Sequence, residues 1–183
     1  MLTDIEPITD ADVVLDWGLA EAAKPEMQLD SQIVSRVRAK AETKEDRIVI
    51  TQRISEYRAM LLGFFAQHPV RWHKATIQVA EIGQIRVIRY FEVVHGSHIK
   101  TIADVAEHLS ELYSIPNFRR EEMRGFPIFA TTHLHAPLCL IEGTHRCREL
   151  LREQGGAPNV RVLIGECPRI IEWHQWPDRK SVV

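Results

Sequence analysis

The chain has 183 residues, of which 45% are hydrophobic and 26% are charged, which is enough for one well-packed domain or for a small domain with an appended helical segment. The formal net charge of −2 provides no overall attraction to nucleic acid or to an anionic membrane. The three cysteines do not form an even set, the N-terminus is acidic and unlike a secretory signal, and no apolar segment approaches the ~20 residues that span a bilayer. These features predict a soluble cytoplasmic protein with no membrane span.

Helical patterns dominate residues 1–69. Short helices are expected over Asp10–Ala23 and over Ser31–Ala41; the basic side chains of the second helix either contact DNA phosphates or form a solvated face. The longest pattern, Glu45–His68, has apolar residues three and four positions apart and stops at Pro69. We therefore expect one long packing helix within an N-terminal helical segment that packs on the core.

β-branched residues dominate from Thr76 to Val94, in two runs separated near Gly83. This composition predicts a hairpin or a strand pair. Arg86 and Arg89 would then lie on opposite faces of the second strand, so each would bind a phosphate only singly.

A helix is expected from Thr101, because Thr101 and Asp104 have capping-box spacing and apolar residues follow on one face. The run TIADVAEHLS resembles the first helix of a helix-turn-helix unit. The recognition helix of such a unit would begin at Pro116, which is tolerated only at a first helical position, and no glycine makes the turn.

Three arginines around Phe118 are candidate DNA contacts: Arg119, Arg120 and Arg124. Arginine beside an aromatic ring can stack on a base or bind phosphates. Two glutamates lie among the three arginines and leave a local charge of +1 by residue count, so a solvated loop or helix is the alternative.

The C-terminal part predicts the order strand, loop, strand, turn, helix, strand. The expected strands are Phe126–Thr132, Leu138–Ile141 and Val160–Ile164, and the helix would end at Gly155-Gly156. In the tail, four apolar residues are expected to pack before a fraying polar end: Ile170, Ile171, Trp173 and Trp176.

The turn between strand and helix concentrates reactive side chains, in the order Glu142, Gly143, Thr144, His145 and Arg146. Thr144 is expected to cap the helix. Two cationic side chains in a first helical turn oppose the usual preference for acidic residues there, and a bound anion would resolve that conflict. The sequence indicates either a phosphate site or an ordinary structural turn.

The string IEGTHRCREL resembles the Gly-x-His-Arg signature of the ParB/sulfiredoxin superfamily, strongly over residues 126–165 and diffusely over residues 70–125. The resemblance implies an α/β (mixed α+β) fold, with a small mixed sheet flanked by helices and a nucleotide-binding core with its tail over residues 70–183. By position, it implicates Gly143, Thr144, His145 and Arg146 in binding nucleotide phosphates.

Superfamily members include DNA-segregation proteins, sulfiredoxins, free-serine kinases and nucleases, so the resemblance narrows the ligand class more than the reaction. Thr144 stands where sulfiredoxins have cysteine, which disfavours sulfinic-acid repair. The DNA-segregation proteins have a Gly-Glu-Arg-Arg box followed by a DNA-binding domain, and little chain follows the motif here. The size and the motif also resemble plasmid fertility-inhibition members, which are associated with ATPase and DNase activities and with blocking DNA transfer through a type IV secretion channel.

The resulting expectation is a nucleotide-binding phosphoryl-transfer enzyme that hydrolyses ATP, with DNase activity as an addition. Glu142, His145 and Arg146 would be catalytic, and Glu142 would hold Mg²⁺ or orient water. The expected partners are a nucleotide, DNA and type IV secretion components. Two alternatives remain: a non-catalytic nucleotide- or DNA-binding regulator, and a partner-binding inhibitor with a degraded site.

A zinc site is a further alternative, because several possible ligands lie at short spacings: His133, His135, Cys139, His145, Cys147, Cys167 and His174. Cys139 falls inside an apolar strand, however, and there is no paired CxxC. The pattern therefore favours Mg²⁺ bound through nucleotide phosphates over structural zinc.

Overall fold

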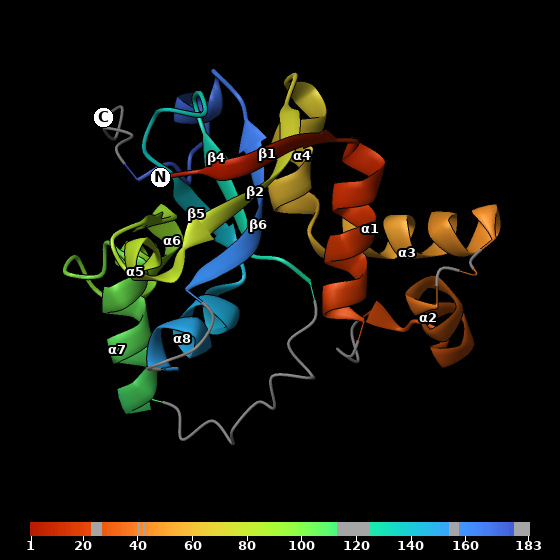
Figure 1. The fold of residues 1–183 in the computed structure, drawn as a ribbon, viewed down its shortest axis with the longest axis horizontal. Helices are drawn as coiled ribbons and strands as arrows, with labels where there is room; N and C mark the ends of the chain where they lie inside the picture. The colour runs from red at the N-terminus through yellow and green to blue at the C-terminus, as the bar shows by residue number, and fades with distance from the viewer. Residues whose placement is uncertain (23–26, 40, 42, 113–124, 154–157, 178–183) are drawn as a thin grey trace. The chain divides into compact units, whose positions relative to one another are not determined.

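A computed structural model describes residues 1–22, 27–39, 41, 43–112, 125–153 and 158–177 (Figure 1). The chain divides into a sheet unit, formed by Met1–Pro7, Val70–Arg119 and Pro127–Val183, and a helical unit, formed by Ile8–Pro69 and Arg120–Phe126. The described residues contain a six-stranded mixed sheet and eight α-helices, which confirms the predicted mixed α/β class.

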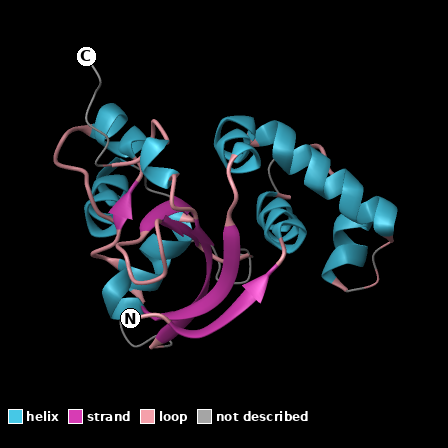
Figure 2. Cartoon of the chain, turned by 90° about the horizontal axis from the view of Figure 1, so that it is seen from above, coloured by secondary structure: helices cyan, strands magenta, loops and turns pink. Residues whose placement is uncertain are grey.

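The sheet has the strand order β1-β2-β6-β4-β5-β3, and Figure 2 shows its strands twisted relative to one another. The strands are β1 (Thr3–Ile8), β2 (Arg71–Gln78), β3 (Arg86–Val87), β4 (Ile128–Thr131), β5 (Cys139–Glu142) and β6 (Asn159–Glu166). The three strands predicted in the C-terminal part are confirmed as β4, β5 and β6. The edge strand β1 was not identified from the sequence, and it places the first seven residues in the sheet unit.

The antiparallel pair of β2 and β6 depends on a glycine. Trp72 lies opposite Gly165 in the register, and a Cβ on Gly165 would lie 2.8 Å from Cζ3 of the Trp72 ring. The indole therefore covers the space that a side chain at position 165 would need.

The predicted strand pair over Thr76–Val94 is wrong. β3 is only two residues long and pairs in parallel with β5, and the rest of the run forms helix α6 (Arg89–His95). The Val87 amide of β3 donates to the Lys100 carbonyl at 3.0 Å. The chain must therefore reverse direction after β3 and lie beside it again at Lys100, thirteen positions later. This tertiary constraint overrides the β propensity of the run.

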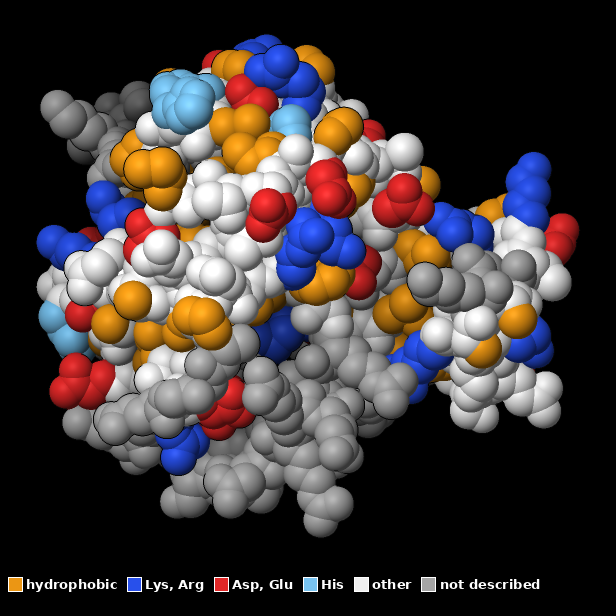
Figure 3. All heavy atoms as spheres, viewed as in Figure 1, with side chains coloured by type: hydrophobic (Ala, Val, Ile, Leu, Met, Phe, Trp, Pro, Cys, Tyr) orange, Lys and Arg blue, Asp and Glu red, His pale blue; other side chains and the backbone are white. Residues whose placement is uncertain are grey.

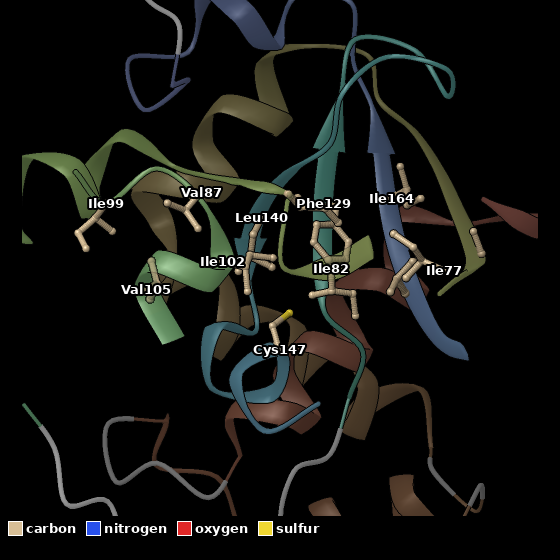
Figure 4. Packing of buried hydrophobic residues seen from close by; sticks show 13 residues of the cluster. Ile77, Ile82, Val87, Ile99, Ile102, Val105, Phe129, Leu140, Cys147 and Ile164 are labelled. Carbon is tan, nitrogen blue, oxygen red and sulfur yellow. The ribbon is translucent and has the colours of Figure 1, made fainter. Parts of the chain in front are cut away.

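Three helices pack on one face of the sheet: α5 (Val79–Ile82), α7 (Ile102–Leu112) and α8 (Thr144–Arg152). Figure 4 shows the shared core, in which residues from these helices meet residues of the strands. The buried members labelled there are Ile77, Ile82, Val87, Ile99, Ile102, Val105, Phe129, Leu140, Cys147 and Ile164.

The start of α7 has the predicted capping box. The Asp104 amide donates to Thr101 Oγ1 at 3.3 Å, and the Thr101 amide donates to Asp104 Oδ2 at 2.8 Å. The second helix of the helix-turn-helix alternative falls within residues 113–124, outside the described residues.

The helical unit contains α1 (Asp10–Glu21), α2 (Ser31–Arg38), α3 (Lys44–Tyr57) and α4 (Ala59–Gln67). The first two confirm the predicted short helices. A Cβ on Gly18 of α1 would clash with Cγ2 of Ile50 in α3, so the missing side chain allows these two helices to approach closely.

The single long helix predicted over Glu45–His68 is wrong, because the chain breaks at Arg58, where φ is −111° and ψ is 28°. The Arg58 guanidinium pairs with the buried carboxylate of Glu21 at 2.9 Å. An ion pair to a residue 37 positions earlier is invisible to a periodicity argument.

Three of the four apolar tail residues are buried, as predicted: Ile170, Trp173 and Trp176. Ile171 is 53% exposed, so its predicted packing is wrong. It belongs to a short 3-10 helix, Ile170–Glu172, which turns the neighbouring side chains in different directions.

Candidate phosphate-binding turn

The predicted strand–turn–helix is confirmed: β5 ends at Glu142 and α8 begins at Thr144. Gly143 lies between them with φ of +101°, a conformation that side chains other than glycine rarely adopt. A Cβ at this position would lie 3.0 Å from the Cα of Pro127. Both the backbone conformation and the close approach of another segment therefore require glycine here.

Thr144 does not cap the helix as predicted. Gly143 holds the N-cap position and Thr144 is the first helical residue; the Cys147 amide donates to the Gly143 carbonyl at 2.9 Å. Gly143 has no side chain with which to bond the first-turn amides, and no acidic residue lies in that turn. The first helical turn itself therefore contributes no carboxylate that would offset the partial positive charge of this helix end.

Arg146 lies over the glycine. Its Nε and Nη2 atoms are each 3.1 Å from the position that a Cβ on Gly143 would occupy. The guanidinium, which always carries a positive charge, is thus held at the N-terminal end of α8. A larger residue at position 143 would displace it.

The remaining predicted site residues differ in exposure. Glu142 and Thr144 are half-buried, and His145 is exposed. The Gly143 amide donates to Oε1 of Glu142 at 3.0 Å, which fixes the carboxylate beside the turn. The structure brings Glu142, Gly143 and Arg146 together, with His145 on the solvent side of the same turn.

Cys147 is part of the core and not of the reactive surface. Its sulfur points into the buried cluster in Figure 4, and burial raises the pKa of its thiol to about 12. A thiol with so high a pKa is a poor nucleophile at neutral pH. Cys139 and Cys167 are also buried, and neither forms a disulfide.

Two residues near the turn have structural roles that sequence reasoning missed. Pro127 forms the floor under Gly143, and its carbonyl accepts from the Leu163 amide at 2.9 Å. Arg148 is 2% exposed, and its Nε and Nη2 atoms donate to Oε1 of Glu149 at 3.0 and 2.7 Å. The pairing of β4 with β5 brings Pro127 to the turn, and no local spacing in the sequence signals that contact.

The predicted DNA contacts Arg119, Arg120 and Arg124 lie outside the described residues. Figure 3 shows acidic and basic side chains interspersed over the described residues of one face. That view offers no extended basic surface for the backbone of a nucleic acid.

A cavity of about 540 Å³ lies at the opposite end of β5 from the turn. Its lining includes Ile77, Glu81, Arg86, His135 and Leu138, and none of the residues of the candidate turn. Arg86 faces this cavity, whereas the amide of Arg89 donates to the Gln175 carbonyl at 2.8 Å at the start of α6.

Comparison of this chain with protein-family models, with curated proteins and with solved structures gave no match. Within the described part of the chain, no three His, Cys, Asp or Glu side chains are grouped in a way that could hold a metal ion. None of the described helices has both the length and the apolar character that crossing a membrane requires.

Proposed function

We propose that the turn between β5 and α8 binds the phosphates of a nucleotide and that the protein is a phosphoryl-transfer enzyme, most simply an ATPase. The observation that carries the proposal is the combination at Gly143: a positive φ, a backbone floor at Pro127 and the Arg146 guanidinium held over the glycine. An oxyanion placed there would meet helix amides and a fixed cation within one turn.

Each residue has a role that follows from its position. The amides at the start of α8 would hold phosphate oxygens, as helix N-termini do elsewhere. Arg146 would offset charge that develops on the transferred phosphoryl group, and the exposed imidazole of His145 would bind the same group from the solvent side. Thr144 would contribute its amide.

Glu142 fits Mg²⁺ as a single protein carboxylate. This ion is commonly bound through one or two carboxylates together with substrate phosphates and water. Bound there, Mg²⁺ would neutralise phosphate charge. Glu142 itself would orient a water molecule, since its carboxylate is already positioned by the Gly143 amide.

The same contact favours a second candidate, a non-catalytic nucleotide-binding regulator. One oxygen of Glu142 already accepts the Gly143 amide at 3.0 Å, and it is the only carboxylate within residues 142–146. A carboxylate that stabilises the turn need not activate water. Action on DNA or on a type IV secretion system depends on the sequence resemblance, and a cytoplasmic location depends on the composition.

The test is Mg²⁺-dependent release of phosphate from ATP by the purified chain and by single variants. We expect Arg146→Ala to lower turnover by about 100-fold, because a preorganised charge on the reacting phosphoryl group is lost; His145→Ala should also lower it. Arg152→Ala is the matched control, since it removes the same charge from the last turn of α8, where the side chain is 55% exposed.

The outcomes separate the candidates. Turnover that is lost in the Arg146 variant and retained in the Arg152 variant, with both folded by circular dichroism, supports the enzyme. Nucleotide binding without turnover in the wild type would favour the regulator. If the wild type binds no nucleotide, both candidates are wrong.

A further inference from the structure

Three histidines surround the turn between α6 and α7. His95 is the last residue of α6, His98 follows in the sequence His-Gly-Ser-His, and His108 lies within α7. The pattern His-x₂-His-x₉-His lies apart from the turn at Gly143.

The backbone between the two helices is shaped by Gly96. This residue has φ of +116°, and a Cβ on it would lie 2.9 Å from Cε1 of the His98 ring. The Ile99 amide donates to the Gly96 carbonyl at 3.0 Å, and Ile99 is buried in the core. The turn is thus joined to the hydrophobic core through Ile99.

The rings of His95 and His108 meet directly. Nδ1 of His95 lies 3.3 Å from Nε2 of His108, and the ring centroids are 5.0 Å apart. His95 also stacks on Phe91, one turn earlier in α6, with 26° between the ring planes. Phe91 itself packs against the hydrophobic core, so the His95 ring is held on two sides.

The separation of 3.3 Å suits a shared metal ion. Imidazole nitrogens lie about 2.0–2.1 Å from zinc, and two such ligands on a tetrahedral ion are therefore about 3.3 Å apart. The same contact is also a hydrogen bond between the two rings, in which the tautomers decide which nitrogen donates. An ion bound by both nitrogens would replace this hydrogen bond.

The surroundings also suit a cation. Asp104 lies one helical turn before His108 on the same face of α7, and its carboxylate accepts the amides of Lys100 and Thr101 at 2.9 and 2.8 Å. The His98 ring is 6.2 Å from that of His108, and it is not grouped with the other two rings as a third ligand.

We propose that His95 and His108 form a two-histidine binding site for a divalent transition metal of the zinc, nickel or copper class. Such ions favour imidazole nitrogen, whereas Mg²⁺ and Ca²⁺ favour oxygen ligands. With two protein ligands, the remaining positions belong to water or to an added ligand. The site is therefore open, unlike a closed structural zinc site with four protein ligands.

The experiment is calorimetric titration of the full chain, freed of metal by a chelator, with Ni²⁺ and Zn²⁺. We expect saturable binding of one ion. His95→Ala and His108→Ala should each weaken it at least about tenfold, since loss of even an outer-shell partner of a metal ligand costs about 10–100-fold. His174→Ala, which removes an exposed histidine elsewhere, should leave affinity unchanged.

A second measurement needs no variant. Substoichiometric Cu²⁺ added to the wild type should broaden the ring-proton resonances of His95 and His108 before those of His133, His135 or His174. The proposal is overturned if the wild type shows no saturable binding. It is equally overturned if folded His95→Ala and His108→Ala proteins bind as the wild type does, or if the other histidines broaden first.

Discussion

Gly143 meets two requirements that other residue types do not meet together. It adopts a positive φ, and it leaves room for both the backbone of Pro127 and the guanidinium of Arg146. The glycine shapes the backbone of the turn and also allows the cation to lie at the end of the helix. The backbone of the turn and the proposed phosphate binding thus both depend on Gly143.

Gly143→Ala should destabilise the protein by about 1–3 kcal/mol, the usual cost of forcing a residue with a side chain into an unfavourable backbone region. Urea unfolding measures the change. Gly83→Ala is the control in the same unit, because its added Cβ would make only ordinary contacts, at 3.6 Å to Ala103 and Leu151. Equal stability of the Gly143 variant and the wild type would contradict the described turn.

At the scale of single helices, the junction of α2 and α3 has the most clearly perturbed carboxylate of the helical unit. The carboxylate of Asp46 is buried and accepts hydrogen bonds from Nε and Nη2 of Arg36 at 2.8 and 2.6 Å. It also forms a capping box with Thr43. The hydrogen bond from Arg36 lowers the pKa of Asp46 well below its usual range, and the amide of Thr43 adds to the effect. The charged carboxylate therefore stabilises the folded state.

The direction of the pH dependence follows from this lowered pKa. In the unfolded chain Asp46 titrates near its ordinary value of about 3.9, so its contribution is present above that pH and is lost as the pH falls toward the folded value. Asp46→Asn should lower the free energy of unfolding at pH 7 and reduce its decline between pH 5 and pH 2. Chemical denaturation at several pH values, followed by helical circular dichroism, measures both effects.

The control for this prediction is Glu45→Gln, which removes a neighbouring exposed charge from the first turn of α3. It should leave the acid dependence nearly intact. The assigned role of Asp46 would be contradicted if its variant and the Glu45 variant had the same profile.

Helices that depend on local signals could be predicted from the sequence. Features that depend on contacts between residues far apart in the chain could not. Thr101 and Asp104 mark the start of α7 by spacing alone, and their hydrogen bonds confirm it. The break at Arg58 accompanies an ion pair with Glu21, and α6 replaces a predicted strand where the chain must return to β3. Neither contact has a local pattern.

The candidate turn was predictable as strand, glycine and helix, because each of these has a short-range signature. The contact of Gly143 with Pro127 was not predictable, since it depends on the pairing of β4 with β5. The position of Arg146 over Gly143 also depends on a side-chain direction that spacing does not determine. The contact between His95 and His108 likewise requires the packing of α6 and α7.

At the scale of the whole molecule, the net charge of −2 gives no long-range attraction for polyanions. Affinity for a nucleotide would have to arise locally, at the amides and the guanidinium of one turn. The two proposed sites are also carried by neighbouring helices of the sheet unit: His108 lies on α7 and Arg146 on α8, and both helices contribute to the same buried cluster.

The most direct test of the central claim is to map the backbone amide resonances of the ¹⁵N-labelled protein as a non-hydrolysable ATP analogue with Mg²⁺ is added. We predict that the largest saturable shifts fall on Gly143, Thr144, His145, Arg146 and Cys147, and that they are lost in Arg146→Ala. Saturable shifts confined to other parts of the chain, with these five amides unchanged, would contradict the assignment of a phosphate site to this turn.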